Sequence, residues 1–126
     1  MLLKDKFYTV LHEEKIDSNN AVYLVEVKAD CDVYQGHFPH KAVCPGVCNI
    51  ETIRECAEML TGEDLYIKTI KQCRLTEIAA PQICPEVDVT VQVTPNQPDT
   101  TAYTVVANIS DATRSFMDFK GTLTVS

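Results

Sequence analysis

The sequence of 126 residues has no long apolar run near its start, no excess of basic charge and no internal repeat. The first ten residues already carry Lys4, Asp5 and Lys6, so they lack the apolar core of a signal peptide and the length of a membrane span. We therefore expect a cytoplasmic protein that does not enter a membrane. No stretch combines low hydrophobicity with high charge, which predicts a chain ordered nearly from end to end.

Acidic residues outnumber basic ones by 18 to 11, which gives a formal net charge of −7. This charge argues against general binding to nucleic acid or to anionic lipid. An anionic partner would need a local basic patch, and Lys68, Lys71 and Arg74 lie close enough together to supply one. These residues form either a weak docking site or a solvated strand face.

The six cysteines are expected to remain reduced, because the sequence shows no secretory signal. In that state they behave as small apolar residues. A zinc site can be imagined from four residues, but their spacing matches none of the paired short-loop zinc patterns. Those four residues are Cys31, His37, Cys44 and Cys48.

The length suits one hydrophobic core, so we expect a single domain over residues 1–126. Four segments alternate apolar and polar residues with the period of a half-buried strand. They are 21–29, 87–93, 103–109 and 117–125. Segments 8–16 and 66–75 give weaker strand signals, because charged residues interrupt both faces of the second segment.

One substantial helix is predicted after Pro45. Its apolar residues recur at steps of three and four, and Gly62 is suited to end it. The apolar positions are Val47, Ile50, Ile53, Ala57 and Leu60. Two strands, one helix and about four further strands indicate an α+β fold in which an antiparallel sheet curls around a single helix.

The segment from Gly36 to Glu51 is the most informative part of the sequence. It reads Gly-His-Phe-Pro-His-Lys-Ala-Val-Cys-Pro-Gly-Val-Cys-Asn-Ile-Glu. It resembles the signature of the 3-hydroxyacyl-acyl-carrier-protein dehydratases of bacterial fatty-acid synthesis. In that signature Gly-His-Phe-Pro precedes Pro-Val, Pro-Gly-Val and an acidic residue on the central helix. The resemblance implies a hot-dog fold, with one central helix wrapped by about six antiparallel strands.

The sequence departs from this family at several places. His40 stands where glycine is usual, and Glu55 stands where glutamine is common. The apolar Pro-Phe-Leu-Leu stretch typical of the family's N-terminal segment is absent, so the acyl-chain length stays open. The match around Arg74 and Glu86 is loose, because it needs inserted residues.

Dehydration of a 3-hydroxyacyl thioester needs a base for the C2 proton, an acid for the C3 hydroxyl and donors to the thioester carbonyl. His37 is the candidate base, since Phe38 and Pro39 give it an apolar setting that favours a neutral ring. Glu51 is the candidate acid, on the expectation that its carboxyl faces a poorly hydrated cavity. Taken alone, His37 could be only a core histidine. Glu51 alone could be only an acid near the helix N-terminus that complements the helix dipole.

The backbone N–H groups of Gly46 and Val47, at the start of the predicted helix, are the candidate donors to the carbonyl. Binding of this kind requires no cofactor and no metal. The expected lining of the substrate tunnel comprises Phe38, Pro39, Val43, Pro45, Cys48, Ile50 and Glu55. The sequence leaves open whether Glu55, one turn after Glu51, helps or disturbs the site.

The resemblance also implies a homodimer, or a higher oligomer, in which each site takes its histidine and its acid from different subunits. The implied substrate is an acyl thioester carried by acyl carrier protein or by coenzyme A. Two alternatives remain. One is a hot-dog thioesterase in which Glu51 activates water toward the acyl carbon. The other is a non-catalytic acyl-thioester-binding subunit, in a homodimer or a mixed dimer.

Overall fold

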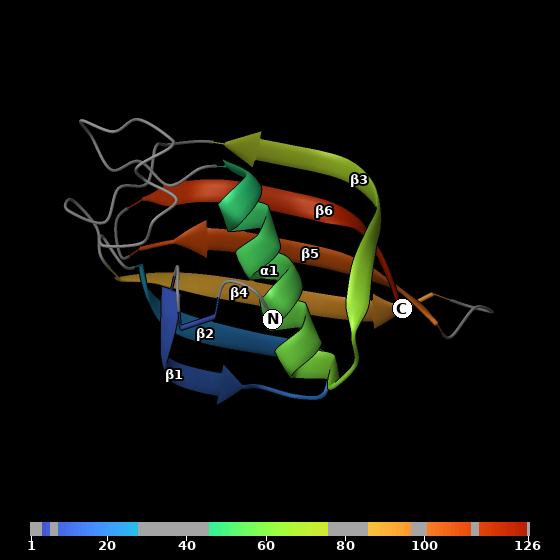
Figure 1. Cartoon of the computed structure of the whole chain (residues 1–126), viewed down its shortest axis with the longest axis horizontal. Coiled ribbons are helices and arrows are strands. Elements are labelled where there is room, and N and C mark those ends of the chain that lie inside the picture. Colours follow the sequence, from blue (N-terminus) through green and yellow to red (C-terminus); the bar gives the residue numbers. More distant parts are fainter. Residues whose placement is uncertain are drawn as a thin grey trace.

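The computed structural model describes residues 4, 5, 8–27, 46–75, 86–96, 101–111 and 114–125. These residues form an α-helix and six β-strands, in the order that the sequence predicts (Figure 1). In chain order the elements are β1 (Tyr8–Lys15), β2 (Asn20–Val27), α1 (Gly46–Thr61), β3 (Leu65–Leu75), β4 (Glu86–Pro95), β5 (Ala102–Ser110) and β6 (Ser115–Val125).

The six strands form one sheet in the order β1-β2-β4-β5-β6-β3, and every neighbouring pair is antiparallel. Strands β4, β5 and β6 are neighbours both along the chain and in the sheet, so they form an antiparallel meander. Helix α1 crosses one face of the curved sheet (Figure 1). Strands β1 and β3 lie at the two edges. This is the α+β hot-dog arrangement expected from the sequence.

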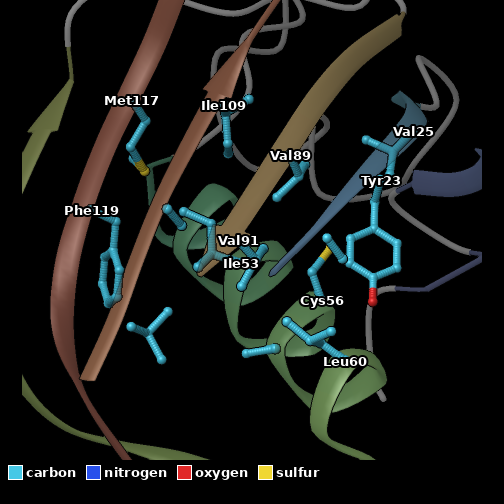
Figure 2. Close-up of a cluster of buried hydrophobic side chains, with 14 of the residues drawn as sticks. Tyr23, Val25, Ile53, Cys56, Leu60, Val89, Val91, Ile109, Met117 and Phe119 are labelled. Atoms are coloured by element: carbon cyan, nitrogen blue, oxygen red, sulfur yellow. The ribbon is translucent and has the colours of Figure 1, made fainter. Parts of the chain in front are cut away.

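The core lies between α1 and the face of the sheet that it covers (Figure 2). The alternation read from the sequence decides which side chains enter it, since residues two apart in a strand point to the same face. The sheet contributes Val89, Val91, Val105, Ala107, Ile109, Met117, Phe119 and Leu123, and the helix contributes Ile53, Cys56, Ala57 and Leu60.

Two β-bulges explain why β3 gives a weak strand signal. In the ladder with β6, Lys68 and Lys71 are skipped, because the register shifts between Ile67 and Thr69 and again between Ile70 and Gln72. A bulge inserts one residue and breaks the two-residue alternation. Strand β1 has a similar shift in its ladder with β2, at Leu11, and its strand signal is weak for the same reason.

The bulges give β3 a local spacing of three on the face that it shares with the core. Ile67, Ile70 and Cys73 lie opposite Leu123, Gly121 and Phe119, which occupy alternate positions of β6. Directly opposed residues share a face of the sheet. Apolar residues three apart therefore line one side of this strand, although such spacing normally indicates a helix.

Gly121 permits the close approach of β3 to β6 at these bulges. A Cβ atom at this position would lie 2.5 Å from the carbonyl oxygen of Thr69 and 3.1 Å from the Phe119 ring. The first contact involves backbone, which cannot move aside without disturbing the ladder. Glycine is thus required here by space and not by an unusual φ angle.

We predict that Gly121→Ala lowers the free energy of unfolding by about 1–3 kcal/mol, the usual cost of overpacking. Urea denaturation measures this change. Thr122→Ala is the matched control on the other face of β6, and its effect should stay within about 0.5 kcal/mol. Equal stability of Gly121→Ala and the unmodified protein would contradict the close approach.

Candidate active site

The segment from Gly36 to Glu51 is described only from Gly46 onward. Helix α1 begins at Gly46, so the backbone of Gly46 and Val47 forms its first turn, as the sequence predicts. Glu51 follows in the second turn. The other predicted site residues of the segment lie outside the described residues: His37, Phe38, Pro39, His40, Val43 and Pro45.

Glu51 forms an ion pair with Arg54, three residues further along α1. Its side chain retains 31% exposure in the single chain. The sequence suggested a poorly hydrated cavity around this carboxyl, whereas the structure gives it a charged partner and partial contact with solvent. The physical reason is helix geometry, since residues three apart are neighbours on the helix surface.

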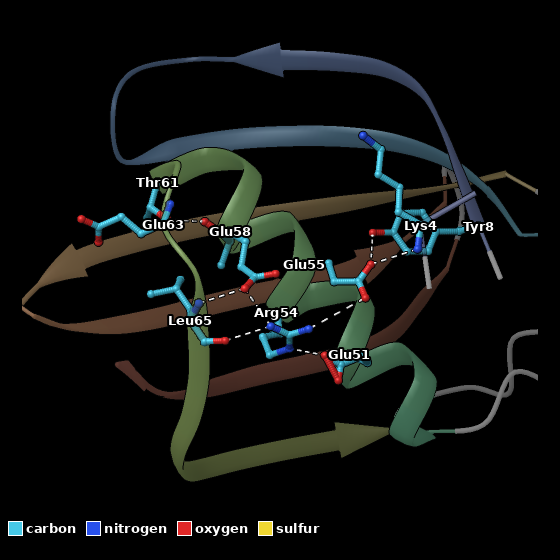
Figure 3. Close-up of polar contacts among 10 residues, drawn as sticks. Lys4, Tyr8, Glu51, Arg54, Glu55, Glu58, Thr61, Glu63 and Leu65 are labelled. Atoms are coloured by element: carbon cyan, nitrogen blue, oxygen red, sulfur yellow. Dashed lines mark hydrogen bonds and ion pairs between the residues drawn. The ribbon is translucent and has the colours of Figure 1, made fainter. Parts of the chain in front are cut away.

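Arg54 links α1 to the start of β3 (Figure 3). Its Nη1 atom donates to the Leu65 carbonyl oxygen at 2.8 Å and forms an ion pair with the Glu58 carboxylate at 2.9 Å. Its Nη2 atom lies 3.9 Å from Oε2 of Glu55. Local spacing marks Arg54 only as a polar helix position and does not indicate this central role.

Burial acts to lower the pKa of the Arg54 guanidinium, but the carboxylates around it outweigh that effect. The hydrogen bond and charge of Glu51, with the charges of Glu58 and Glu55, leave the pKa of Arg54 above its ordinary value. Glu58 also accepts the backbone N–H of Leu65 at 2.9 Å. Both contacts use Oε2 of Glu58, which thereby fastens the end of α1 to β3.

Glu55 is fully buried and faces the N-terminal residues (Figure 3). Its Oε1 atom accepts the Tyr8 hydroxyl at 2.8 Å and the backbone N–H of Lys4 at 3.1 Å. Burial, the nearby Cys56 thiol and the hydrogen bond to Glu55 raise the pKa of Tyr8 far above its ordinary value. Glu55 therefore anchors the N-terminal strand to the helix, and Arg54 contacts both Glu55 and Glu51.

Cys48 and Ile50, two predicted tunnel residues, lie in the first turns of α1. Cys48 is buried, and Ile50 is partly buried against the core. Asn49 between them is also buried, and its Nδ2 atom has no hydrogen-bond partner among the described residues. The hydroxyl of Thr52, by contrast, donates to the Cys48 carbonyl oxygen at 2.8 Å.

The basic residues considered for docking lie on β3 at the sheet edge. Lys68, Lys71 and Arg74 are all exposed. Lys68 and Lys71 are the bulged residues, while Arg74 lies opposite Asp118 of β6. The three positive charges therefore share one strand without sharing a regular strand face.

Within the described part of the chain, no group of three or more metal-ligating side chains is placed to hold an ion. Of the four residues considered as zinc ligands, only Cys48 belongs to that part. The thiols of Cys56 and Cys73 are free. The described ranges also include no helix long and apolar enough to cross a bilayer.

Among the described residues, one helix packed on a six-stranded antiparallel sheet gives the arrangement of the hot-dog class of proteins. Residues 13–115 match the family described as ApeI-like, ApeI dehydratase, and the chain belongs to this family. The resemblance to dehydratases seen in the sequence is thereby confirmed at the level of the family.

Among curated proteins, the chain is similar to the 3-hydroxyacyl-acyl-carrier-protein dehydratase FabZ of Levilactobacillus brevis, with 29% identity over 92 residues. The match covers 64% of this chain and 62% of the relative, so the chain spans about three fifths of that protein's length.

Two solved structures resemble the whole chain. The dehydratase heterocomplex ApeI:P from Xenorhabdus doucetiae gives a TM-score of 0.68 at 16% identity, with 92% of this chain and 96% of that chain covered. A hypothetical thioesterase with coenzyme A from Streptococcus pneumoniae also gives 0.68, at 11% identity, with 97% and 89% covered. At these identities the likeness shows the hot-dog fold.

We predict that Arg54→Met lowers the free energy of unfolding by about 3 kcal/mol, because the variant removes a positive charge from buried carboxylates. Arg54→Lys should recover only part of the loss, since a single ammonium cannot reach the same set of acceptors. Chemical denaturation of both variants provides the measurement.

Arg114→Met is the matched control for this prediction. Arg114 forms an ion pair with Asp111 at the same three-residue spacing, but its side chain is 35% exposed. Its loss should cost about 1 kcal/mol or less. If Arg54→Met were no more harmful than Arg114→Met, the buried ion pairs would not be what fastens α1 to β3.

Proposed function

We propose that this protein dehydrates a 3-hydroxyacyl thioester to the trans-2-enoyl thioester. One observation carries the proposal. The helix of an ApeI-like dehydratase family member begins at Gly46 of the dehydratase-like motif and carries Glu51 in its second turn. The relatedness to a FabZ dehydratase supports the same reaction.

In the proposed reaction, His37 removes the C2 proton and Glu51 gives a proton to the C3 hydroxyl. The electron pair of the C2–H bond becomes the new C2=C3 double bond. The C3–O bond breaks, and the hydroxyl leaves as water. The backbone N–H groups of Gly46 and Val47 receive the thioester oxygen, where negative charge develops as the C2 proton departs.

The ion pair between Glu51 and Arg54 favours a second candidate function. As a general acid, Glu51 must carry a proton and must exchange Arg54 for the substrate hydroxyl. A paired carboxylate is instead already in the form that a general base needs. A thioesterase would use that carboxylate to direct water at the acyl carbon, breaking the C–S bond and releasing a free thiol and a carboxylic acid.

We propose that the active form is a homodimer that pairs through β3. This 11-residue strand lies at a sheet edge and is exposed on both faces over most of its length. Tyr66, Ile70 and Leu75 are each about half exposed there, at 48%, 45% and 51%. Long edge strands with exposed apolar residues are usually covered in native assemblies. A mixed dimer is the alternative, in which this chain is a non-catalytic thioester-binding subunit.

The proposed substrate is carried by acyl carrier protein or by coenzyme A, with the acyl chain in a tunnel along α1. Cys48 and Ile50 lie near the helix start, where the tunnel would begin. Lys68, Lys71 and Arg74 would offer positive charge to an acidic carrier at the adjoining edge. A cytoplasmic location stays a prediction.

The direct test uses short and medium 3-hydroxyacyl thioesters of pantetheine, coenzyme A and acyl carrier protein. We expect enoyl absorbance without release of free thiol. His37→Ala and Glu51→Gln should each lower the rate about 100-fold or more, the usual contribution of a general acid or base. The exposed β1 residues His12 and Glu14 provide matched controls, as His12→Ala and Glu14→Gln.

Release of free thiol without enoyl product would contradict the dehydratase proposal and favour the thioesterase. Absence of both products from a folded dimer that still binds thioester would favour the non-catalytic subunit.

We further predict that inactive His37→Ala and Glu51→Gln proteins regain activity when mixed. Exchange of subunits would create one site with both intact residues, giving up to about a quarter of the normal rate if the subunits combine at random. Mass spectrometry of differently labelled subunits verifies the exchange. Exchange without recovered turnover would argue that both residues of a site come from one chain.

A further inference from the structure

Asn49 carries a buried polar group that the fold leaves without a partner. Its side chain is 5% exposed, and Nδ2 has no hydrogen-bond partner among the described residues. An amide N–H removed from water without a new acceptor is costly. Native proteins satisfy nearly all such groups, so an exception near a candidate active site calls for an explanation.

The position of Asn49 directs this amide toward the start of α1. Asn49 precedes Ile53 by four residues and Ala57 by eight, so it continues the stripe of the helix that packs on the sheet. Side chains of an α-helix lean toward its N-terminus, so the Asn49 amide lies over the first turn. Gly46, three residues earlier, is its neighbour on the helix surface.

Backbone and side-chain N–H donors are therefore expected close together at the start of α1. The first turn of an α-helix has backbone N–H groups with no acceptor four residues earlier. The unpaired amide of Asn49 adds a side-chain donor beside them. Glu51 lies about 200° around the helix axis from Asn49, so the two side chains leave the helix on nearly opposite faces.

We propose that the side-chain amide of Asn49 donates a hydrogen bond to the thioester carbonyl oxygen of the bound acyl substrate, beside the backbone N–H groups of Gly46 and Val47. This inference depends on the proposed function only in its choice of a thioester as ligand. Asparagine side chains and helix N-terminal amides are both established donors to oxygens that gain negative charge.

The sharpest test separates binding of the carbonyl from turnover. The probes are butyryl-pantetheine and the butyl thioether of pantetheine, which lacks the carbonyl oxygen. Titration calorimetry should show that the unmodified protein binds the thioester more tightly than the thioether. Asn49→Leu should lower this preference about 5-fold, in line with the loss of one net hydrogen bond, and leave affinity for the thioether unchanged.

Stability distinguishes a ligand-binding amide from a structural one. Because Asn49→Leu removes an unpaired donor, we expect its free energy of unfolding to be equal to or above that of the unmodified protein. Tyr23→Phe is the matched control, since the Tyr23 hydroxyl is also buried without a partner among the described residues and lies beside Cys56 (Figure 2). It should be equally tolerated and should keep the preference for the thioester.

For the dehydration itself, Asn49→Leu should lower kcat about 100-fold, as loss of one such donor does elsewhere. A stable Asn49→Leu protein that keeps both the preference for thioester and its turnover would overturn the inference and leave the dehydratase proposal intact. A preference for thioester that depends on Asn49, in a protein without dehydratase activity, would support the inference while the proposed reaction failed.

Discussion

Helix α1 is enclosed by protein along nearly its whole length, and the polar groups that it carries must find partners there. Apart from Asn49, residues on the side facing the sheet are apolar, whereas Thr52, Glu55 and Glu58 are buried despite their polarity. Unpaired buried charge is strongly destabilising. The contacts made by Arg54 and by the Tyr8 hydroxyl satisfy the two carboxylates, and the Thr52 hydroxyl donates to the Cys48 carbonyl oxygen. The contacts of Arg54 and Tyr8 also join α1 to the third and first strands, so they both pair the buried carboxylates and position the helix.

Enclosure of the helix also bears on its chemistry. Arg54, which serves the buried Glu58, contacts the candidate acid Glu51 as well. Substrate must therefore compete with a neighbouring guanidinium for that carboxylate. A site in which Arg54 pairs with Glu51 differs from one in which an acid lies alone in an apolar pocket. The pairing leaves both the acid role and the base role chemically accessible to Glu51.

Much of the fold could be predicted from the sequence. Regular alternation identified β4, β5 and β6, and apolar steps of three and four identified α1. Strands β1 and β3 gave weak signals because bulges at Leu11, Lys68 and Lys71 break the alternation. A bulge depends on the partner strand, so single-strand periodicity cannot show it. The packing of Gly121 against Thr69 is likewise visible only in the paired ladder.

Less of the candidate site could be predicted. The motif located Gly46 and Glu51 on the helix, since both follow from local spacing. The contacts of Glu55 with Lys4 and Tyr8 join residues 51 and 47 positions apart, which no local pattern indicates. Asn49 did carry a signal, because it stands four residues before Ile53 on the apolar stripe. An uncharged polar residue on such a stripe is easily taken for ordinary helix surface.

The place of α1 in the chain has a consequence during synthesis of the protein. The ribosome releases α1 before β4, β5 and β6, the strands that provide much of its cover. In that interval the nascent helix exposes Ile53, Ala57 and Leu60 to water. The pairs of Arg54 with Glu51 and Glu58 span only three and four residues, so they can form before any strand is present. The residues that pair the buried carboxylates of α1 in the folded protein thus also give the nascent helix charge and local order before the sheet forms.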